Sequence, residues 1–313
     1  MHFLIRVFAH SIRTGKNMET ASYVVPKVRR KKKSELIVVW KRLRKNKMAI
    51  FGLVILSIIC ISALFANFLF DYETDVIQQT ASQRLKPPSA QHWLGTDEVG
   101  RDILARIVYG ARVSLPVAFS TILIATIVGG LLGAIAGYGS KTLDNIIMRI
   151  MDVFLAVPSI LLSIAIVAAL GPSMINLLIA ISISNIPPFS RIVRAAVLSI
   201  RSEEYIEAAR AIGAYNNRIV LRHILPNSMA PIIVQATLCI AGSILAIASL
   251  SFIGLGIQPP TPEWGSMLAG GRQYIRYAWW VCAFPGIAIM LTILSLNMLG
   301  DGLRDALDPK LKN

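Results

Sequence analysis

Charged residues are scarce in this chain of 313 residues: they make up 16% of it, against about a quarter in soluble domains. Hydrophobic residues make up 55%, and several apolar runs reach the ~20 residues that a helix needs to cross a bilayer. A membrane admits only helical bundles or closed barrels, and long unbroken apolar runs favour helices. Composition therefore argues against an ordinary soluble enzyme and predicts an all-α polytopic membrane protein.

Reactive side chains are also few. The cysteines lie far apart in apolar segments, which predicts neither a disulfide framework nor a metal site. The histidines are scattered, and no Ser/His/Asp or metal-ligand spacing occurs, so we expect no catalytic residues and no bound metal. The residues concerned are Cys60, Cys239, Cys282, His2, His10, His92 and His223. Acidic residues are nearly absent from the apolar runs, which disfavours an ATP-independent secondary transporter, since that class would need them.

A nucleotide-binding motif is missing as well. Lys141-Thr142 resembles the end of a phosphate-binding loop, but the glycine that should stand directly before the lysine is absent, and no strand leads into it. We therefore expect this chain to bind no ATP and no other cofactor.

Positive charge is concentrated near the N-terminus, where residues 1–47 hold 14 Lys/Arg and 2 acidic residues. An arm that binds nucleic acid is one interpretation of such a run. We favour the other, a cytosolic flank that touches anionic lipid, and expect no nucleic-acid partner. If residues 1–47 are inside, 25 of the 32 Lys/Arg lie on the inner side of the predicted spans. This asymmetry predicts that both termini and the polar segment 202–226 are cytosolic.

The apolar runs predict six transmembrane helices. In chain order we expect a basic cytosolic tail (1–47), a first transmembrane helix (48–70), an external loop (71–112), a five-helix membrane domain (113–300) and a cytosolic C-terminal tail (301–313). The external loop should contain an amphipathic helix from Asp102 to Val113 that lies along the outer surface. The five further spans are expected at about 113–137, 146–170, 174–198, 230–256 and 281–300.

Glycine and proline mark special positions within the spans. Gly129, Gly133 and Gly137 recur on one helical face and predict a close helix–helix contact. Pro158 should kink the third span. Pro187-Pro188 should break the fourth, with Ser184 and Asn185 satisfying the backbone groups that are freed. Because broken helices at membrane depth face protein or a watery cavity, Asn185, Pro187 and Pro188 are our candidates for pathway lining; a kink that serves packing alone is the alternative.

One polar stretch, Ser202 to Pro226, separates two long apolar regions. It predicts two short helices. Ser202 can cap the first helix, and Gly213 suits its end because glycine adopts a left-handed conformation without strain. Asn216 or Asn217 can start the second helix, which Pro226 should prevent from continuing.

The same stretch contains Glu207-Ala208-Ala209, Gly213 and His223-Ile224-Leu225-Pro226 at a regular spacing. In these residues it resembles the EAA loop of bacterial ABC importer permeases. His223 stands where the usual pattern has isoleucine, while the Leu-Pro pair and the spacing are intact. The string WLGTDEVGRD at 93–102 resembles the dipeptide/oligopeptide/nickel subfamily, and the segment 301–309 resembles the ending of dipeptide permeases. Within that subfamily the chain most resembles the C-type subunit of dipeptide permeases.

The resemblance implies a type I ABC importer permease fold in the bacterial cytoplasmic membrane. It implies four kinds of partner besides lipid: a second homologous permease, two cytosolic ATPase subunits that use the ATP, and an external solute-binding protein. The loop would couple to an ATPase through Glu207, Ala208, Ala209, Arg210, Gly213, His223, Leu225 and Pro226. Import of di- or oligopeptides by alternating access is the favoured function. Nickel import is the alternative within the family, with His92 as the one outer residue suited to bind the metal.

Overall fold

The computed structural model describes residues 35–307, so the predictions for most of the basic tail and for the last six residues lie outside the described part. Regular structure in this part is helical, apart from one isolated bridge between Thr96 and Asp102. The α-helices are α2 (Glu35–Leu43), α3 (Lys47–Leu64), α4 (Ala66–Leu69), α5 (Ile103–Tyr138), α6 (Lys141–Leu155), α7 (Ser159–Leu170), α8 (Met174–Arg201), α9 (Glu204–Ala211), α10 (Asn216–Ile219), α11 (Leu225–Phe252), α12 (Trp264–Gly271) and α13 (Trp280–Leu307). The short elements are η1 (Tyr72–Ile77), η2 (Ala81–Gln83), η3 (Val220–Ile224) and η4 (Arg272–Tyr274).

Among the described residues, five helices are long and apolar enough to cross a membrane: α3, α5, α8, α11 together with η3, and α13. The predicted total of six is reached if α6 and α7 count as one broken span. These two helices meet at an angle of 84°. The break lies where the sequence predicts a kink, because Pro158 has no N–H and precedes the first residue of α7. The bend is far larger than a kink.

The expected surface helix at 102–113 does not exist as a separate element. Instead α5 runs without interruption for 36 residues, a length of ~54 Å. Its first turns are buried on most sides, with Ile103, Arg106 and Tyr109 all at or below 5% exposure. Two parts of the chain cover these turns: segment 71–102, which we call the outer segment after the side on which the sequence analysis expects it, and the loop before α12. The apolar periodicity therefore reflects burial within the chain.

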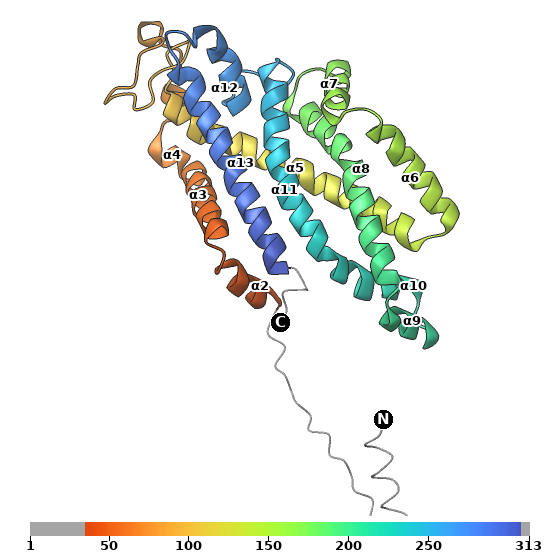
Figure 1. The fold of residues 1–313 in the computed structure, drawn as a ribbon. Helices are drawn as coiled ribbons and strands as arrows, with labels where there is room; N and C mark the ends of the chain where they lie inside the picture. Colours follow the sequence, from red (N-terminus) through yellow and green to blue (C-terminus); the bar gives the residue numbers. More distant parts are fainter. Residues whose placement is uncertain (1–34, 308–313) are drawn as a thin grey trace, which may run out of the picture. The chain divides into compact units, whose positions relative to one another are not determined.

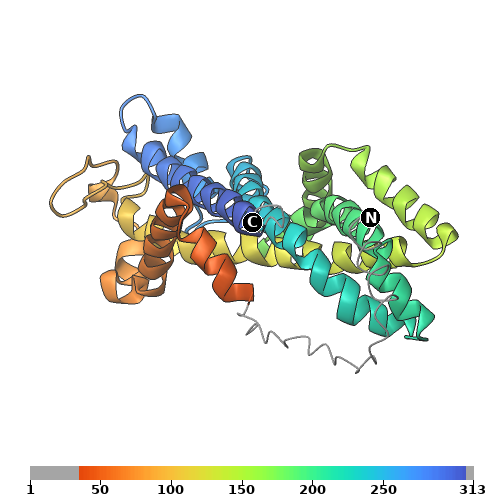
Figure 2. The ribbon, with the colours of Figure 1, turned by 60° about the horizontal axis from the view of Figure 1, so that its bottom comes forward.

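Four of the long helices lie side by side (Figure 1), in the order α3, α13, α11 and α8, and each contacts the next. Helix α5 crosses behind this row (Figure 1) and contacts α3, α11 and above all α8. Helix α6 lies at the edge beyond α8 (Figure 2), where ion pairs join Asp144 to Arg194 and Asp152 to Arg191, each at 2.5 Å. The row and the crossing helix together enclose the main hydrophobic core.

The crossing of α5 and α8 depends on the predicted glycine face. A Cβ built on Gly133 would lie 2.4 Å from the Ser190 carbonyl oxygen, and one on Gly129 would lie 2.7 Å from that of Ile186. Gly137 packs in the same way against Val197. The structure therefore confirms that this face brings two backbones into direct contact.

The prediction that Pro187-Pro188 breaks the fourth span is wrong, since α8 runs as one helix through both prolines. Ser184 Oγ donates to the Ala180 carbonyl and Asn185 Nδ2 to the Ile181 carbonyl. These carbonyls lie one turn before the ones that the prolines leave without a partner, so the expected compensation is also absent. Pro187 is buried, and α5 and α11 hold α8 from both sides. Packing therefore overrides the local break.

We predict that Gly133→Ala destabilises the protein by ~1–3 kcal/mol, because the new methyl group would overlap the α8 backbone. Gly130→Ala is the matched control: its Cβ would lie 4.0 Å from the nearest atom, Val193 Cγ2. That variant should gain up to ~1 kcal/mol from the higher helix propensity of alanine. Thermal unfolding of the two variants in detergent tests this, and equal midpoints would refute the close contact.

Candidate functional sites at the two ends of the helices

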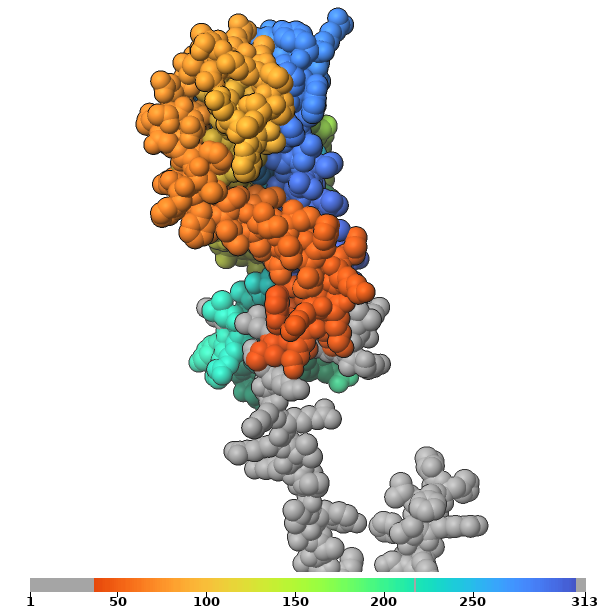
Figure 3. All heavy atoms as spheres, turned by 90° about the vertical axis from the view of Figure 1, so that its left-hand side faces the viewer, coloured from red at the N-terminus to blue at the C-terminus, as the bar shows by residue number. Residues whose placement is uncertain are grey.

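The polar stretch forms a helical hairpin of α9, α10 and η3 between α8 and α11. It lies at the end of the helices opposite to the outer segment 71–102 and α12 (Figures 1 and 3). We call residues 202–226 the hairpin.

The start of the first hairpin helix differs from the prediction. Ser202 is the last residue of the turn that ends α8, and its Oγ donates to the Ser199 carbonyl. Glu203 stands at the N-cap of α9 without a side-chain cap, while Glu204 and Glu207 lie in the first turn. There the positive end of the helix dipole favours their carboxylates. A serine cap was expected because only sequence spacing was considered; α8 extends three residues further than predicted and takes Ser202 into its own end.

The end of α9 confirms the role of Gly213. Its φ of +82° is left-handed, and its N–H donates to the Arg210 carbonyl at 2.9 Å. The next N–H, of Ala214, donates to the Ala209 carbonyl at 3.1 Å. This pair of bonds is the Schellman motif, which satisfies the last carbonyls of a helix and reverses the chain. The turn of the hairpin thus depends on a conformation that suits glycine.

The second hairpin helix begins at Asn216, as predicted, but Pro226 does not end it. The chain passes from α10 through the π-helical turn η3 directly into α11. The Leu225 N–H bonds the Val220 carbonyl, five residues back. Such a widened turn accommodates the proline, which stands in the first turn of α11, where its missing N–H costs little. No non-helical residue therefore separates the second half of the hairpin from α11.

The hairpin is anchored on the ends of α5 and α8. Ile206, Ile219 and Ile224 are fully buried against a cluster that includes Val193 and Val197 of α8. Polar contacts centre on Tyr138, the last residue of α5. Its hydroxyl bonds Asn216 Oδ1 at 2.7 Å, and the guanidinium groups of Arg201 and Arg210 lie over its ring. A movement of the hairpin must therefore also move the ends of the helices beneath it.

The predicted coupling residues gather on this one element. Glu207, Ala208, Arg210, Gly213 and Pro226 are exposed, and Ala209, His223 and Leu225 are half-buried. The sequence analysis missed three large apolar side chains that the hairpin exposes, namely Ile212 (85% exposed), Tyr215 (84%) and Leu221 (67%). Their presence among the charged and polar residues of this stretch is the sequence feature that could have indicated them. Exposed apolar groups rimmed by charges are typical of a protein–protein contact.

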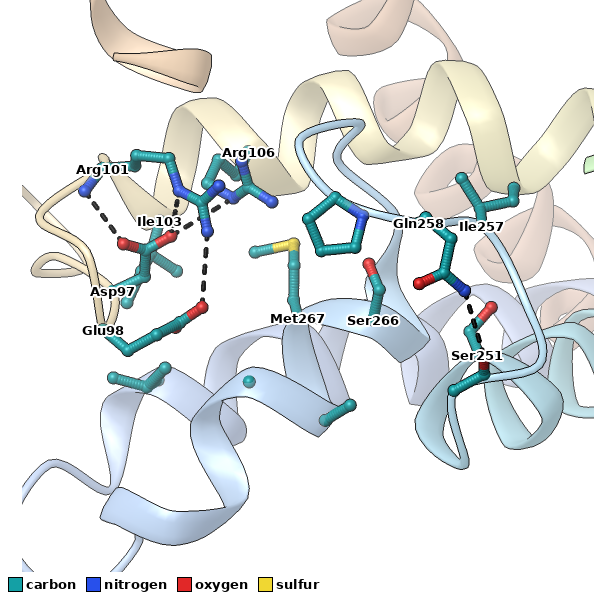
Figure 4. Close-up of a pocket in the computed structure, with 15 residues that line it drawn as sticks. Asp97, Glu98, Arg101, Ile103, Arg106, Ser251, Ile257, Gln258, Ser266 and Met267 are labelled. Carbon is teal, nitrogen blue, oxygen red and sulfur yellow. Dashed lines mark hydrogen bonds and ion pairs between the residues drawn. The ribbon is translucent and has the colours of Figure 1, made fainter. Parts of the chain in front are cut away.

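The other end of the helices carries a buried charge cluster built from the WLGTDEVGRD string (Figure 4). Asp97 accepts hydrogen bonds from the backbone N–H of Val99 and Arg101 and from Arg101 Nε at 2.6 Å. Arg106 Nε lies 3.5 Å from the same carboxylate, and Arg106 Nη1 donates to the Val76 carbonyl at 2.8 Å. Charges this deeply buried persist only when paired and hydrogen-bonded. The cluster therefore fastens the outer segment to α5.

A cavity of about 160 Å³ adjoins this cluster and separates it from α12 (Figure 4). Glu98 lies at its edge, where burial, and next the charge of Asp97, raises the pKa of the Glu98 carboxyl. Burial likewise raises the pKa of Glu263, whose carboxylate accepts the Gly265 and Ser266 N–H groups at the start of α12. Both carboxyls are thus costly to ionise in the folded protein.

His92, the candidate outer metal ligand, is engaged within the chain. Its Nδ1 lies 2.8 Å from an Asp102 carboxylate oxygen, and its Nε2 contacts Gln83. The other Asp102 oxygen accepts the Ala105 N–H and caps α5. Within residues 35–307 no three His, Cys, Asp or Glu side chains come together as a metal site would require. His92 thus serves to hold the outer loop against the start of α5.

The long apolar helices and the anchored hairpin define a polytopic permease subunit. The chain belongs to the family of binding-protein-dependent transport system inner membrane components, which matches residues 129–313, and residues 34–88 match the N-terminal TM domain of oligopeptide transport permease C.

Named relatives agree with this membership. The dipeptide transport system permease protein DppC of Alkalihalophilus pseudofirmus is 56% identical over 88% of this chain and 90% of its own length. The di/tripeptide transport system permease protein DppC of Pseudomonas aeruginosa is 49% identical over 88% and 92%. Among solved structures, the inward-facing MetNI methionine ABC transporter aligns with a TM-score of 0.55 and 21% identity over 66% of this chain and 98% of that chain. This likeness confirms the type I ABC importer permease fold.

We predict that Glu98→Gln changes how stability depends on pH. Because the folded-state pKa is raised, Glu98 contributes stability below its unfolded-state pKa, and that contribution is lost as pH rises through the folded-state pKa. The glutamine variant lacks this loss. Its unfolding midpoint, relative to that of the unaltered protein, should therefore increase as the pH rises above about 4, the ordinary pKa of a glutamate carboxyl. Glu73→Gln, at an exposed carboxyl of the same outer segment, is the control. A Glu98→Gln curve parallel to that of the unaltered protein would contradict the prediction.

Proposed function

We propose that this chain is a permease subunit of an ATP-driven ABC importer that moves di- and oligopeptides across the bacterial cytoplasmic membrane. The hairpin carries the proposal: it presents apolar side chains to a partner, and it is fixed to the helices that would have to move. The substrate class is supported by the relatives, which are named as dipeptide and di/tripeptide permeases at 49–56% identity.

The proposed complex contains a second homologous permease, two cytosolic ATPase subunits and an external solute-binding protein. The excess of Lys/Arg on the hairpin side of the spans supports cytosolic placement of the hairpin and of both termini. ATP is bound and hydrolysed by the ATPase subunits, and this chain contributes no cofactor site. The outer segment 71–102 and α12 would then face the binding protein.

In the proposed docking, Ile212, Tyr215 and Leu221 enter an apolar cleft on the ATPase, because burying such side chains supplies most of the affinity of a protein contact. The small side chains of Ala208 and Ala209 allow close approach. Glu207 and Arg210 lie on the polar rim, where charges set orientation more than affinity. His223, Leu225 and Pro226 connect the docked part to α11.

Alternating access follows from this connection. When ATP draws the two ATPases together, each hairpin is displaced, and α8 and α11 must follow because they are continuous with it or packed beneath it. A ligand shifts an equilibrium only by its differential affinity for the two states. Transport therefore requires ATP inside and the loaded binding protein outside to favour the same arrangement.

Nickel import is the alternative within the family. It is disfavoured because His92 already contacts Asp102 and Gln83. The test is reconstitution of the complex in liposomes with its binding protein and ATP. We expect uptake of a labelled dipeptide that requires ATP, and no uptake of labelled nickel. Dipeptide uptake that persists without the ATPase subunits would instead indicate a secondary transporter.

We predict that Gly213→Val uncouples ATP hydrolysis from uptake. A β-branched residue is strained at the left-handed φ of +82°, at a cost of ~1–2 kcal/mol. No other atom lies within 4 Å of a Cβ at this position, so the protein should still reach the membrane. Uptake should fall by about tenfold while hydrolysis continues.

Gly213→Asn is the matched control, because asparagine tolerates this conformation. It should retain coupled uptake. Normal uptake per ATP hydrolysed in the valine variant would show that the turn of the hairpin does not transmit motion.

A further inference from the structure

We propose that one exposed to half-exposed face of α11 forms this subunit's wall of the peptide pathway. This face, the α11 stripe, comprises Pro231, Gln235, Leu238, Gly242, Leu245 and Ser249, spaced alternately four and three residues apart so that they share one side of the helix. The opposite side, with Ile244 and Ile247, is buried in the core. The inference rests on the function proposed above and assigns the passage to particular residues.

The composition of the stripe is wrong for a surface that faces lipid. The Ser249 hydroxyl donates to the Leu245 carbonyl of its own helix, but the Gln235 amide has more polar groups than its one bond satisfies, and an amide exposed to hydrocarbon is costly. Helix α3 offers a direct comparison within this chain. Its exposed face is apolar throughout, with Phe51, Val54, Ile58, Ile61 and Leu64 between 50% and 71% exposed. Lipid suits α3, whereas the α11 stripe suits water and a polar solute.

Two open hollows lie along the stripe, one toward each end of α11. The hollow nearer the hairpin, of about 430 Å³, is lined by Pro231, Gln235 and Leu238 together with Arg304 of α13. The hollow nearer α12, of about 420 Å³, is lined by Leu245 and Ser249 together with residues of α12 and α13. Between them Gly242 has no atom within 4 Å of the place where a Cβ would stand. We call the two hollows, together with the open surface at Gly242 between them, the α11 groove.

The polar groups in this groove match a peptide. The Gln235 side chain makes one hydrogen bond within residues 35–307, from Nε2 to the Cys239 sulfur at 3.1 Å, which leaves its carbonyl oxygen able to accept a peptide N–H. Arg304 makes no ion pair with any other described residue, and its guanidinium suits a free carboxylate. Contacts to the backbone and the C-terminal carboxylate of the solute would allow binding of peptides whatever their side chains.

This assignment moves the pathway from one helix to its neighbour. The sequence favoured Asn185, Pro187 and Pro188 on α8, but Pro187 is buried and Asn185 Nδ2 bonds its own helix. In the proposal α8 supports the wall from behind, and α11, which continues directly from the hairpin, presents it.

The test uses the reconstituted complex with the three cysteines of this subunit replaced by alanine. Gly242→Cys and Ile58→Cys are then treated with a charged, membrane-impermeant methanethiosulfonate. Ile58 is the control because it is 62% exposed on the apolar face of α3. We expect Gly242→Cys to react on the order of a hundredfold faster, since a charge is excluded from hydrocarbon by about that factor. Saturating dipeptide-loaded binding protein should slow the reaction.

A Gly242→Cys that reacts as slowly as Ile58→Cys would overturn the proposal, whether lipid or the second permease covers the stripe. A second variant, Gln235→Met, keeps the length of the side chain and removes the amide. It should lower dipeptide uptake per assembled complex by about tenfold, the effect of one lost hydrogen bond; unchanged uptake would also count against the stripe.

ATP-driven dipeptide uptake by the unaltered complex is measured first. Its absence would refute the proposed function, whereas its presence with an unreactive stripe would refute only this inference.

Discussion

Close contact between the backbones of α5 and α8 is the constraint on which the rest of this protein depends. Three glycines on one face of α5 let the helices approach until a single methyl group would overlap. At the hairpin end this contact forms the platform that buries Ile206, Ile219 and Ile224 and places Tyr138 beneath Arg201 and Arg210. In a bilayer such contacts rely on van der Waals packing rather than on apolar burial. The position of the hairpin is thus set by the same contact that organises the membrane helices.

The opposite end of α5 is fixed by electrostatics. Arg106 reaches from the second turn of α5 to Asp97 and to the Val76 carbonyl, and Asp102 both caps the helix and holds His92. Trp264 Nε1 donates to the Ile107 carbonyl and attaches the start of α12 to the same turns. Buried ion pairs of this kind fix a geometry more reliably than they add stability. Specific contacts therefore hold both ends of α5, with ion pairs at this end and the hairpin at the other.

Local sequence signals predicted some features well and others poorly, for a consistent physical reason. The long apolar helices, the glycine face and the left-handed Gly213 depend on short-range pattern or on a backbone conformation that one residue type favours. The same holds for the location of the bend at Pro158, although the bend is far sharper than the predicted kink. The wrong predictions concern places where distant residues decide. Helix α8 continues through Pro187 and Pro188 because neighbours hold it on both sides, and a π-helical turn carries the hairpin past Pro226. The first turns of α5 are covered by the loop before α12, which lies far away in the sequence. The exposure of Ile212, Tyr215 and Leu221 likewise depends on which side of the hairpin packs against α5 and α8, and that packing is not visible in the local sequence.

The close α5–α8 contact and the ion pairs at the start of α5 also affect how motion could pass through the molecule. In the proposed mechanism the hairpin receives a displacement at one end of α11, and the unbroken run from η3 through Phe252 carries it along the helix. A flexible break in the helix at Pro226 would allow the hairpin to move without α11. Because the π-helical turn keeps the chain helical through Pro226, there is no such break. Helix α11 contacts α5 far less extensively than α8 does, and it carries the groove with Gln235 and Gly242. The helix that is most directly connected to the hairpin is therefore also the one whose movement would most change the space open to a solute. A tilt of α11 relative to α5 could open one of its two hollows while it narrows the other, which is the geometric requirement of alternating access.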